Sequence, residues 1–234
     1  MGALGIGTPA VAGRRLERQA GPYQRGGRPP LPAFELIATI VHAAPGEDGD
    51  HSQRQAPQMI RRYLRAARAR RALLILDVQP GRASFMREVR ALRRFLREPD
   101  VSLALDPEWS IAPGQLPGQQ IGTTDAGTVN EVSRYLSRIV RESDLPQKLL
   151  VVHRFTHDML RDEDRLERHP GVALTVNVDG FGDRANKIAK YRELAGGRRN
   201  RHHGFKLFYR EDTNLMSPGR VLRLRPRPEL IVYE

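Results

Sequence analysis

Short apolar runs recur along the chain, separated by longer polar segments. Runs of this length predict strands, because apolar stretches of four to eight residues bounded by turn residues are typical of buried strands. Several intervening segments instead carry apolar residues at helical spacing. The expected strands are Ala3–Ile6, Phe34–His42, Leu73–Val78, Val101–Asp106, Leu149–His153, Val172–Asp179, Phe205–Tyr209 and Leu230–Tyr233. This alternation predicts an α/β fold with a parallel sheet.

Helix start signals support the intervening helices. Ser52 with Gln55 resembles a capping box, and Ser84 and Asp125 are good N-cap residues ahead of amphipathic stretches. Ser217 is followed by a proline, which favours the first helical position. A further helix is expected around Ala185–Tyr191.

Eight strand–helix units predict a (β/α)8 barrel, with an open doubly wound sheet as the alternative. In Val172–Asp179 one face is apolar throughout, while the other is small at the start and polar at the end. That pattern fits a barrel interior leading to an active-site mouth. We therefore expect one small barrel domain over residues 1–234, trimmed at its termini, with loops at Gly21–Pro32 and Gly196–Gly204.

Composition narrows the functional classes. Hydrophobic residues make up 39% of the 234 residues, which is enough for a sizeable core. The net charge is +12, but only four of the 39 basic residues are lysine, so an arginine-rich solvated shell explains the charge better than a nucleic-acid surface does. Nucleic-acid binding therefore ranks last, and aromatic residues are scarce at 6%.

The sequence has no cysteine, no long apolar run and no pattern typical of a signal peptide. The chain has no cysteine, which excludes disulfides and thiol chemistry. No apolar run approaches the roughly 18 residues needed to span a membrane. The first residues do not resemble a signal peptide, because Gly2, Gly5 and Pro9 interrupt the apolar stretch. The compartment and the oligomeric state stay open.

The segment Asp106-Pro107-Glu108-Trp109 is the strongest chemical candidate. Positions two apart on a strand share a face, so both carboxylates would point the same way. Two neighbouring carboxylates raise the pKa of one of them, which suits a general acid. We therefore expect Glu108 and Asp106 to be catalytic and Trp109 to stack on a sugar ring. The alternative is that Asp106 caps a loop and Glu108 pairs with an arginine.

Other strand ends supply candidate substrate-binding residues. The same two-residue spacing joins Asp77 to Gln79 and Asn177 to Asp179, while His153 and Tyr209 each end a strand. Each has a plain structural alternative: a hydrogen-bonded loop for Asp77, an Asp-Gly turn for Asp179, and packing for Tyr209 and His153.

Metal ligation is the main chemical competitor. The strand ends offer a ligand set for a metal-dependent hydrolase: His42, Asp77, Asp106, His153 and Asp179. Against it, no strand carries a His-X-His pair and no HExxH motif occurs, so we expect neither metal nor cofactor. Walker loops, GxGxxG and Gly-X-Ser-X-Gly are also absent.

The motifs LLILDVQPGR, LALDPEW, NVDGFG, KLFYRED and the ending IVYE resemble an uncharacterised actinobacterial family of cell-surface or lipoprotein-like proteins. The resemblance runs from Phe34 onward and implies an exported, glycosidase-like barrel without an assigned reaction. More loosely, the Asp-X-Glu of residues 106–108 is similar to that of chitinase and lysozyme-type barrels. That similarity implies that Glu108 is the acid and Asp106 its helper.

Two function hypotheses follow. The first is a glycoside-hydrolase-like barrel that acts on a polysaccharide or cell-envelope glycan through carboxylate acid/base chemistry. The second is a non-catalytic envelope protein that binds a glycan at the same mouth. The first requires Asp77, Asp106, Glu108 and Asp179 to converge in one pocket.

Overall fold

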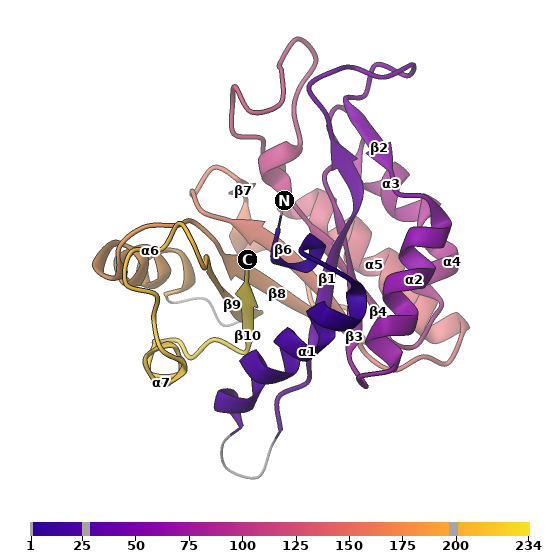
Figure 1. The fold of residues 1–234 in the computed structure, drawn as a ribbon. Helices are drawn as coiled ribbons and strands as arrows, with labels where there is room; N and C mark the ends of the chain where they lie inside the picture. Colours follow the sequence, from indigo (N-terminus) through magenta and orange to yellow (C-terminus); the bar gives the residue numbers. More distant parts are fainter. Residues whose placement is uncertain (1, 25–28, 197–200) are drawn as a thin grey trace.

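The computed structural model describes residues 2–24, 29–196 and 201–234. Its centre is an eight-stranded sheet in the order β10-β9-β8-β6-β4-β3-β1-β2, curled into a half-barrel (Figure 1). All neighbouring strands are parallel except the edge pair β1 and β2. The strands are β1 Ala33–Val41, β2 Ser52–Arg54, β3 Leu73–Val78, β4 Val101–Leu105, β6 Lys148–Arg154, β8 Val172–Val178, β9 His202–Leu207 and β10 Leu230–Tyr233. A separate two-stranded ribbon joins β5 Thr124–Asp125 to β7 Leu160–Arg161.

Helices cover the convex face of the sheet. Apolar side chains such as Leu76, Leu103 and Val152 point outward from the strands and meet helical residues such as Leu64 and Leu136 in the main core. The helices of the described chain are α1 Pro9–Ala20, α2 Pro57–Arg68, α3 Phe85–Ala91, α4 Arg93–Leu96, α5 Ala126–Glu142, α6 Arg184–Ala195 and α7 Pro218–Val221. Figure 1 shows α2 to α5 on one side of the half-barrel and α6 and α7 on the other.

The predicted closed (β/α)8 barrel is wrong. Ala3–Ile6, expected as the first strand, instead contains the 3-10 turn Ala3–Gly5, in which the Gly5 and Ile6 N–H groups donate to the Gly2 and Ala3 carbonyl oxygens rather than to a neighbouring strand. The eighth strand is β2, a short antiparallel partner on the outer edge of β1. No described strand therefore joins β1 to β10, and the sheet stays open between them. Helix α1 lies across this opening, close to both chain ends (Figure 1).

The other seven expected strands are present to within about three residues at each end. Ser84 and Asp125 cap their helices through side-chain hydrogen bonds, as expected. Ser52 does not cap a helix, because it lies in β2 and α2 begins only at Pro57. Of the two expected loops, residues 25–28 and 197–200 lie outside the described residues, while Gly21–Tyr23 forms a 3-10 turn and β9 begins at His202.

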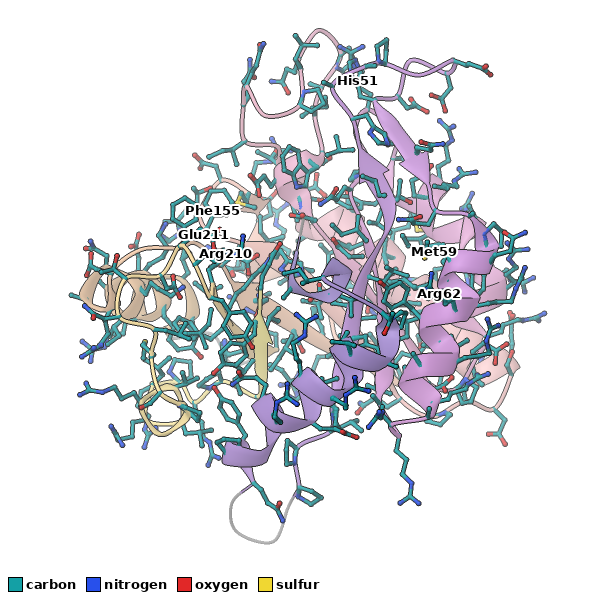
Figure 2. All side chains as sticks on the ribbon, viewed as in Figure 1. His51, Met59, Arg62, Phe155, Arg210 and Glu211 are labelled. Carbon is teal, nitrogen blue, oxygen red and sulfur yellow. The ribbon has the colours of Figure 1, made fainter. Side chains whose placement is uncertain are left out.

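Charged side chains project from the outer surface of the helices (Figure 2). On α2, for example, Arg61, Arg62, Arg65 and Arg68 are exposed, while Ile60 and Leu64 are buried against the sheet. Much of the positive charge therefore lies on the solvated side of the molecule. No helix in the described chain is long and apolar enough to cross a membrane.

Candidate functional site

The concave face of the half-barrel changes character along its strands. Within β3, β4 and β6, Ile75, Ala104 and Val151 form a small apolar cluster. Two residues further along the same strands stand Asp77, Asp106 and His153, which line a cavity of about 1020 Å³. Parallel strands bring their carboxyl ends to one edge, and the alternating side-chain direction turns these polar groups inward together.

The structure brings most of the candidate residues into this one cavity. Those lining it are Asp77, Gln79, Asp106, Glu108, Trp109, His153 and Asp179. Asn177 is fully buried beneath them and donates its amide to Asp179. Tyr209 is not among the lining residues and instead stacks on Tyr233 and donates to Gln19 on α1. His42 is exposed and does not line the cavity.

His153 is the centre of a buried charge network. Its Nε2 lies 2.7 Å from Glu35 Oε1, and its Nδ1 lies 2.9 Å from Asp179 Oδ2. Burial by itself would lower the pKa of His153, but the carboxylates of Asp179 and Glu35 outweigh burial and raise it well above its ordinary value. In this network the imidazole is therefore a cation held between two anions.

The same network keeps the two carboxylates ionised. Burial would raise the pKa of Glu35, yet the charge of His153 holds it below its ordinary value. Burial likewise opposes ionisation of Asp179, but His153 and then Lys206 hold the pKa of Asp179 below its ordinary value. Asp179 is thus a carboxylate with fixed negative charge that faces the cavity.

Lys206 supplies the second cation. Its Nζ lies 3.6 Å from Asp179 Oδ2 and 2.6 Å from Glu234 Oε2, and the Lys206 side chain is only 15% exposed. Burial opposes its charge, but Asp179 and Glu234 raise the pKa of Lys206 above its ordinary value. Sequence reasoning missed Glu35, Lys206 and Glu234, although Glu35 interrupts an apolar strand between Ala33 and Ile37 on the inward face.

Asp77 and Asp106 form a second, less ionised group. Burial, and then the charge of Asp106, raise the pKa of Asp77 well above its ordinary value. Burial also raises the pKa of Asp106, although the charge of His153 opposes it. Gln79 connects Asp106 to strand β1: its Nε2 donates to Asp106 Oδ2 at 3.3 Å, while its Oε1 accepts from the backbone N–H of Val41.

Glu108 stands in the 3-10 turn Pro107–Trp109, just after β4. The expectation that Glu108 and Asp106 share one face of a strand is therefore wrong, because β4 ends at Leu105. Both residues nevertheless line the same cavity. Gly122 packs on this turn so closely that a Cβ there would lie 2.5 Å from the Pro107 oxygen. Burial, and then the charge of Asp106, raise the pKa of Glu108 to about 7.

Aromatic rings surround the charged groups. The rings that line the cavity belong to Tyr63, Trp109, Phe155, Phe181, Phe208 and Tyr233. Phe181 is 70% exposed and packs edge-on against Phe208, with ring centroids 6.0 Å apart. An exposed ring at a polar cavity offers a flat apolar face to a ligand that also carries hydroxyl groups. Of these rings, only Trp109 was identified from the sequence.

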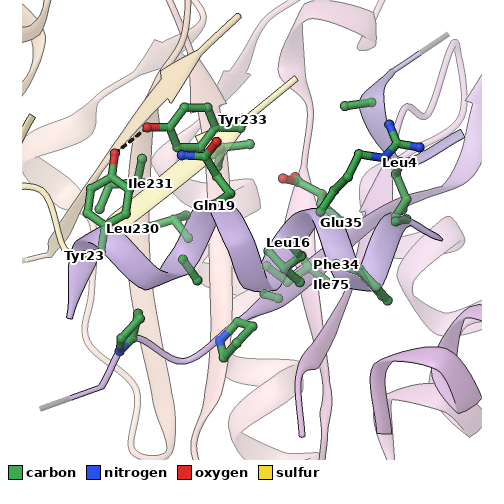
Figure 3. A pocket seen from close by; sticks show the side chains of 18 of the residues that line it. Leu4, Leu16, Gln19, Tyr23, Phe34, Glu35, Ile75, Leu230, Ile231 and Tyr233 are labelled. Carbon is green, nitrogen blue, oxygen red and sulfur yellow. Dashed lines mark hydrogen bonds between the residues drawn. The ribbon is translucent and has the colours of Figure 1, made fainter. Parts of the chain in front are cut away.

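A second cavity of about 700 Å³ lies under α1, in the opening between β1 and β10. Figure 3 shows its lining, which is mainly apolar and includes Leu16, Phe34 and Leu230, with Glu35 facing the space. The Tyr23 and Tyr233 hydroxyls meet at 2.5 Å across it. Glu35 and Tyr233 line both cavities, so the two spaces adjoin.

Comparison with protein-family models, with curated proteins and with solved structures finds no match to this chain.

Proposed function

We propose that the protein hydrolyses a glycosidic bond in a polysaccharide or cell-envelope glycan, with Glu108 as the general acid. The observation that carries this proposal is a partly exposed carboxyl group whose pKa is raised to about 7, in a large cavity lined by aromatic rings. A carboxylic acid that keeps its proton near neutral pH can protonate a departing sugar oxygen. The aromatic rings give the apolar faces of sugars a surface on which to stack.

The neighbouring carboxylates take different roles because their ionisation differs. Asp106 helps Glu108 by raising its pKa. Asp179 stays ionised beside His153 and Lys206, so it is the residue suited to stabilise the positive charge that develops on the sugar ring. Asp77, Gln79 and Trp109 line the cavity where the substrate would lie. The apolar cavity under α1 adjoins this space and offers room for a substrate to extend.

The experiment that tests the proposal is a screen of the purified chain for new reducing ends, against cell-wall polysaccharides and soluble oligosaccharides. Release of reducing ends that falls as the pH rises through about 7 is the expected result, because Glu108 loses its proton there. Glycan binding without turnover across the panel would overturn hydrolysis and favour the non-catalytic glycan-binding protein.

Trp109→Ala is expected to raise KM about three- to tenfold with a smaller change in kcat, since stacking on an aromatic ring contributes about 0.5–1.5 kcal/mol. The Trp109 ring lines the cavity, whereas Tyr135 lies on α5 outside it. Tyr135→Ala therefore controls for the loss of a partly buried ring. Steady-state kinetics on the best glycan from the screen measures both variants, and equal KM values in the two would contradict a stacking role.

Glu108→Gln is expected to stabilise the protein at pH 8 but not at pH 4.5. The pKa of Glu108 is raised from 4.5 to about 7, so between these pH values the native state binds more protons than the unfolded state and stability falls as pH rises. The amide loses no proton and escapes this penalty. Because solvent screens a partly exposed group, we expect a gain of about 1 kcal/mol rather than the full value of the shift.

Denaturant unfolding of wild type and variant at the two pH values measures this gain. Glu131→Gln, on the exposed side of α5, controls for the loss of a carboxylate elsewhere. A stability difference that does not grow with pH would show that the Glu108 carboxyl is not held protonated by its surroundings.

A further inference from the structure

Three side chains from different strands meet at the inner end of the cavity. Glu35 on β1, Asp77 on β3 and His153 on β6 each offer one ligand atom, and these atoms all lie within 4.8 Å of one another. None of the three is adjacent to another in the sequence. Only the parallel arrangement of β1, β3, β4 and β6 brings them together.

Asp77 gives an independent indication that something is bound here. Its side chain is almost wholly buried, at 5% exposed, and its Oδ1 has no hydrogen-bond partner among the described residues. A buried carboxyl oxygen without a partner is costly, and buried polar groups in native proteins are normally paired. This oxygen belongs to the same group that lies beside Glu35 and His153.

His153 is already oriented in the way that metal-binding histidines are. Its Nδ1 is fixed by Asp179 Oδ2 at 2.9 Å, which leaves Nε2 facing the cluster. A carboxylate that holds the far ring nitrogen is the usual support of a histidine ligand. Nε2 now lies 2.7 Å from Glu35 Oε1, and two ligand atoms on one ion stand about 3 Å apart, so only a small separation is needed. The ion replaces the proton between these two atoms, and that proton is released to solvent.

We propose that Glu35, Asp77 and His153 bind one divalent transition-metal ion, with Zn²⁺ held more tightly than Mn²⁺. One imidazole nitrogen and two carboxylate oxygens are ligands that both ions accept, and at such a site Zn²⁺ binds more strongly than Mn²⁺. The hard ions Mg²⁺ and Ca²⁺ prefer an all-oxygen shell and bind more weakly. All three ligands line the cavity, so the remaining coordination position faces the space for a small molecule.

The test uses the full chain without a histidine tag, freed of metal by chelation. Calorimetric titration with ZnCl₂ and absorption titration with CoCl₂ are expected to show one equivalent bound. Asp77→Asn is expected to weaken binding at least about 100-fold, and Asp179→Asn, which removes the carboxylate that orients His153, about 10- to 100-fold. Glu108→Gln, in the same cavity but outside the three ligands, is the matched control and should stay within about threefold of wild type.

Each outcome decides the proposal. No Zn²⁺ binding by wild type at millimolar concentration, or binding that Asp77→Asn leaves unchanged, overturns it. If Asp77→Asn does not fold, pulsed electron paramagnetic resonance of wild type loaded with MnCl₂ decides instead: coupling to one histidine nitrogen supports the site, and its absence overturns it. These measurements need no glycan, so their result stands whether or not the chain hydrolyses a glycosidic bond.

Discussion

Replacing Glu108 with glutamine is expected to lower kcat/KM about 10²- to 10⁴-fold on a natural glycan, the usual contribution of a general acid. Glutamine has nearly the same shape but carries no acidic proton. The leaving oxygen of a sugar is a poor leaving group unless it is protonated, so the whole loss falls on bond cleavage. Because the two side chains have nearly the same volume, we expect the turn Pro107–Trp109 and its contact with Gly122 to stay in place.

The leaving group itself provides the sharpest control. An aryl glycoside that releases dinitrophenolate needs no proton, so Glu108→Gln is expected to retain activity on it to within about tenfold. Comparing the losses of kcat/KM on the natural glycan and on the aryl glycoside distinguishes the loss of a proton donor from a general disruption of the site. Equal losses on both substrates would show that Glu108 binds or positions the sugar and donates no proton.

The apolar pattern of this chain predicts the seven parallel strands of the main sheet but neither β2 nor the failure of the sheet to close. Strand β3 at Leu73–Val78 and strand β10 at Leu230–Tyr233 match the expected bounds, because a short apolar run bounded by turn residues has few other structures available. Closure depends on pairing between residues far apart in the chain. Ala3–Ile6 had the composition of a strand, yet it lies in the segment that leads into α1.

The candidate site, like the fold, could be predicted only in part from the sequence. The spacing of Asp77 with Gln79, and the polar ends of β4 and β6, predict several of the residues that share the cavity but not Glu35, Lys206 or Glu234. The roles within it depend on partners that no local motif reveals. The sequence alone is also consistent with a core histidine at position 153. In the structure, Glu35 and Asp179 lie at the two nitrogens of the His153 ring. In the sequence nothing separates Lys206 from the other basic residues. Its burial beside Asp179 and Glu234 becomes visible only in the structure.

Lys206→Met is expected to destabilise the fold and to move the alkaline limit of activity to higher pH. The substitution keeps the length of the side chain but removes the cation beside Glu234 and leaves Asp179 with His153, and breaking a buried ion pair costs about 3 kcal/mol. The charge of Lys206 also lowers the pKa of Glu108, although burial and Asp106 outweigh it. Without that charge the pKa of Glu108 rises further, so the acid keeps its proton to a higher pH.

Lys187 offers a comparison, because it is also a buried lysine in an ion pair. Its Nζ lies 2.9 Å from Asp212 Oδ1, and it is not among the residues that line the cavity. Lys187→Met should lose a similar amount of stability in denaturant unfolding, yet leave the midpoint of the alkaline limb of kcat/KM where it is in wild type. The two variants together separate weakened packing from altered electrostatics. If both variants shift that midpoint, or neither does, the charge of Lys206 does not set the protonation of Glu108. The fixed charges of the network would then act on the fold alone, and the acid strength of Glu108 would follow from its burial and from Asp106.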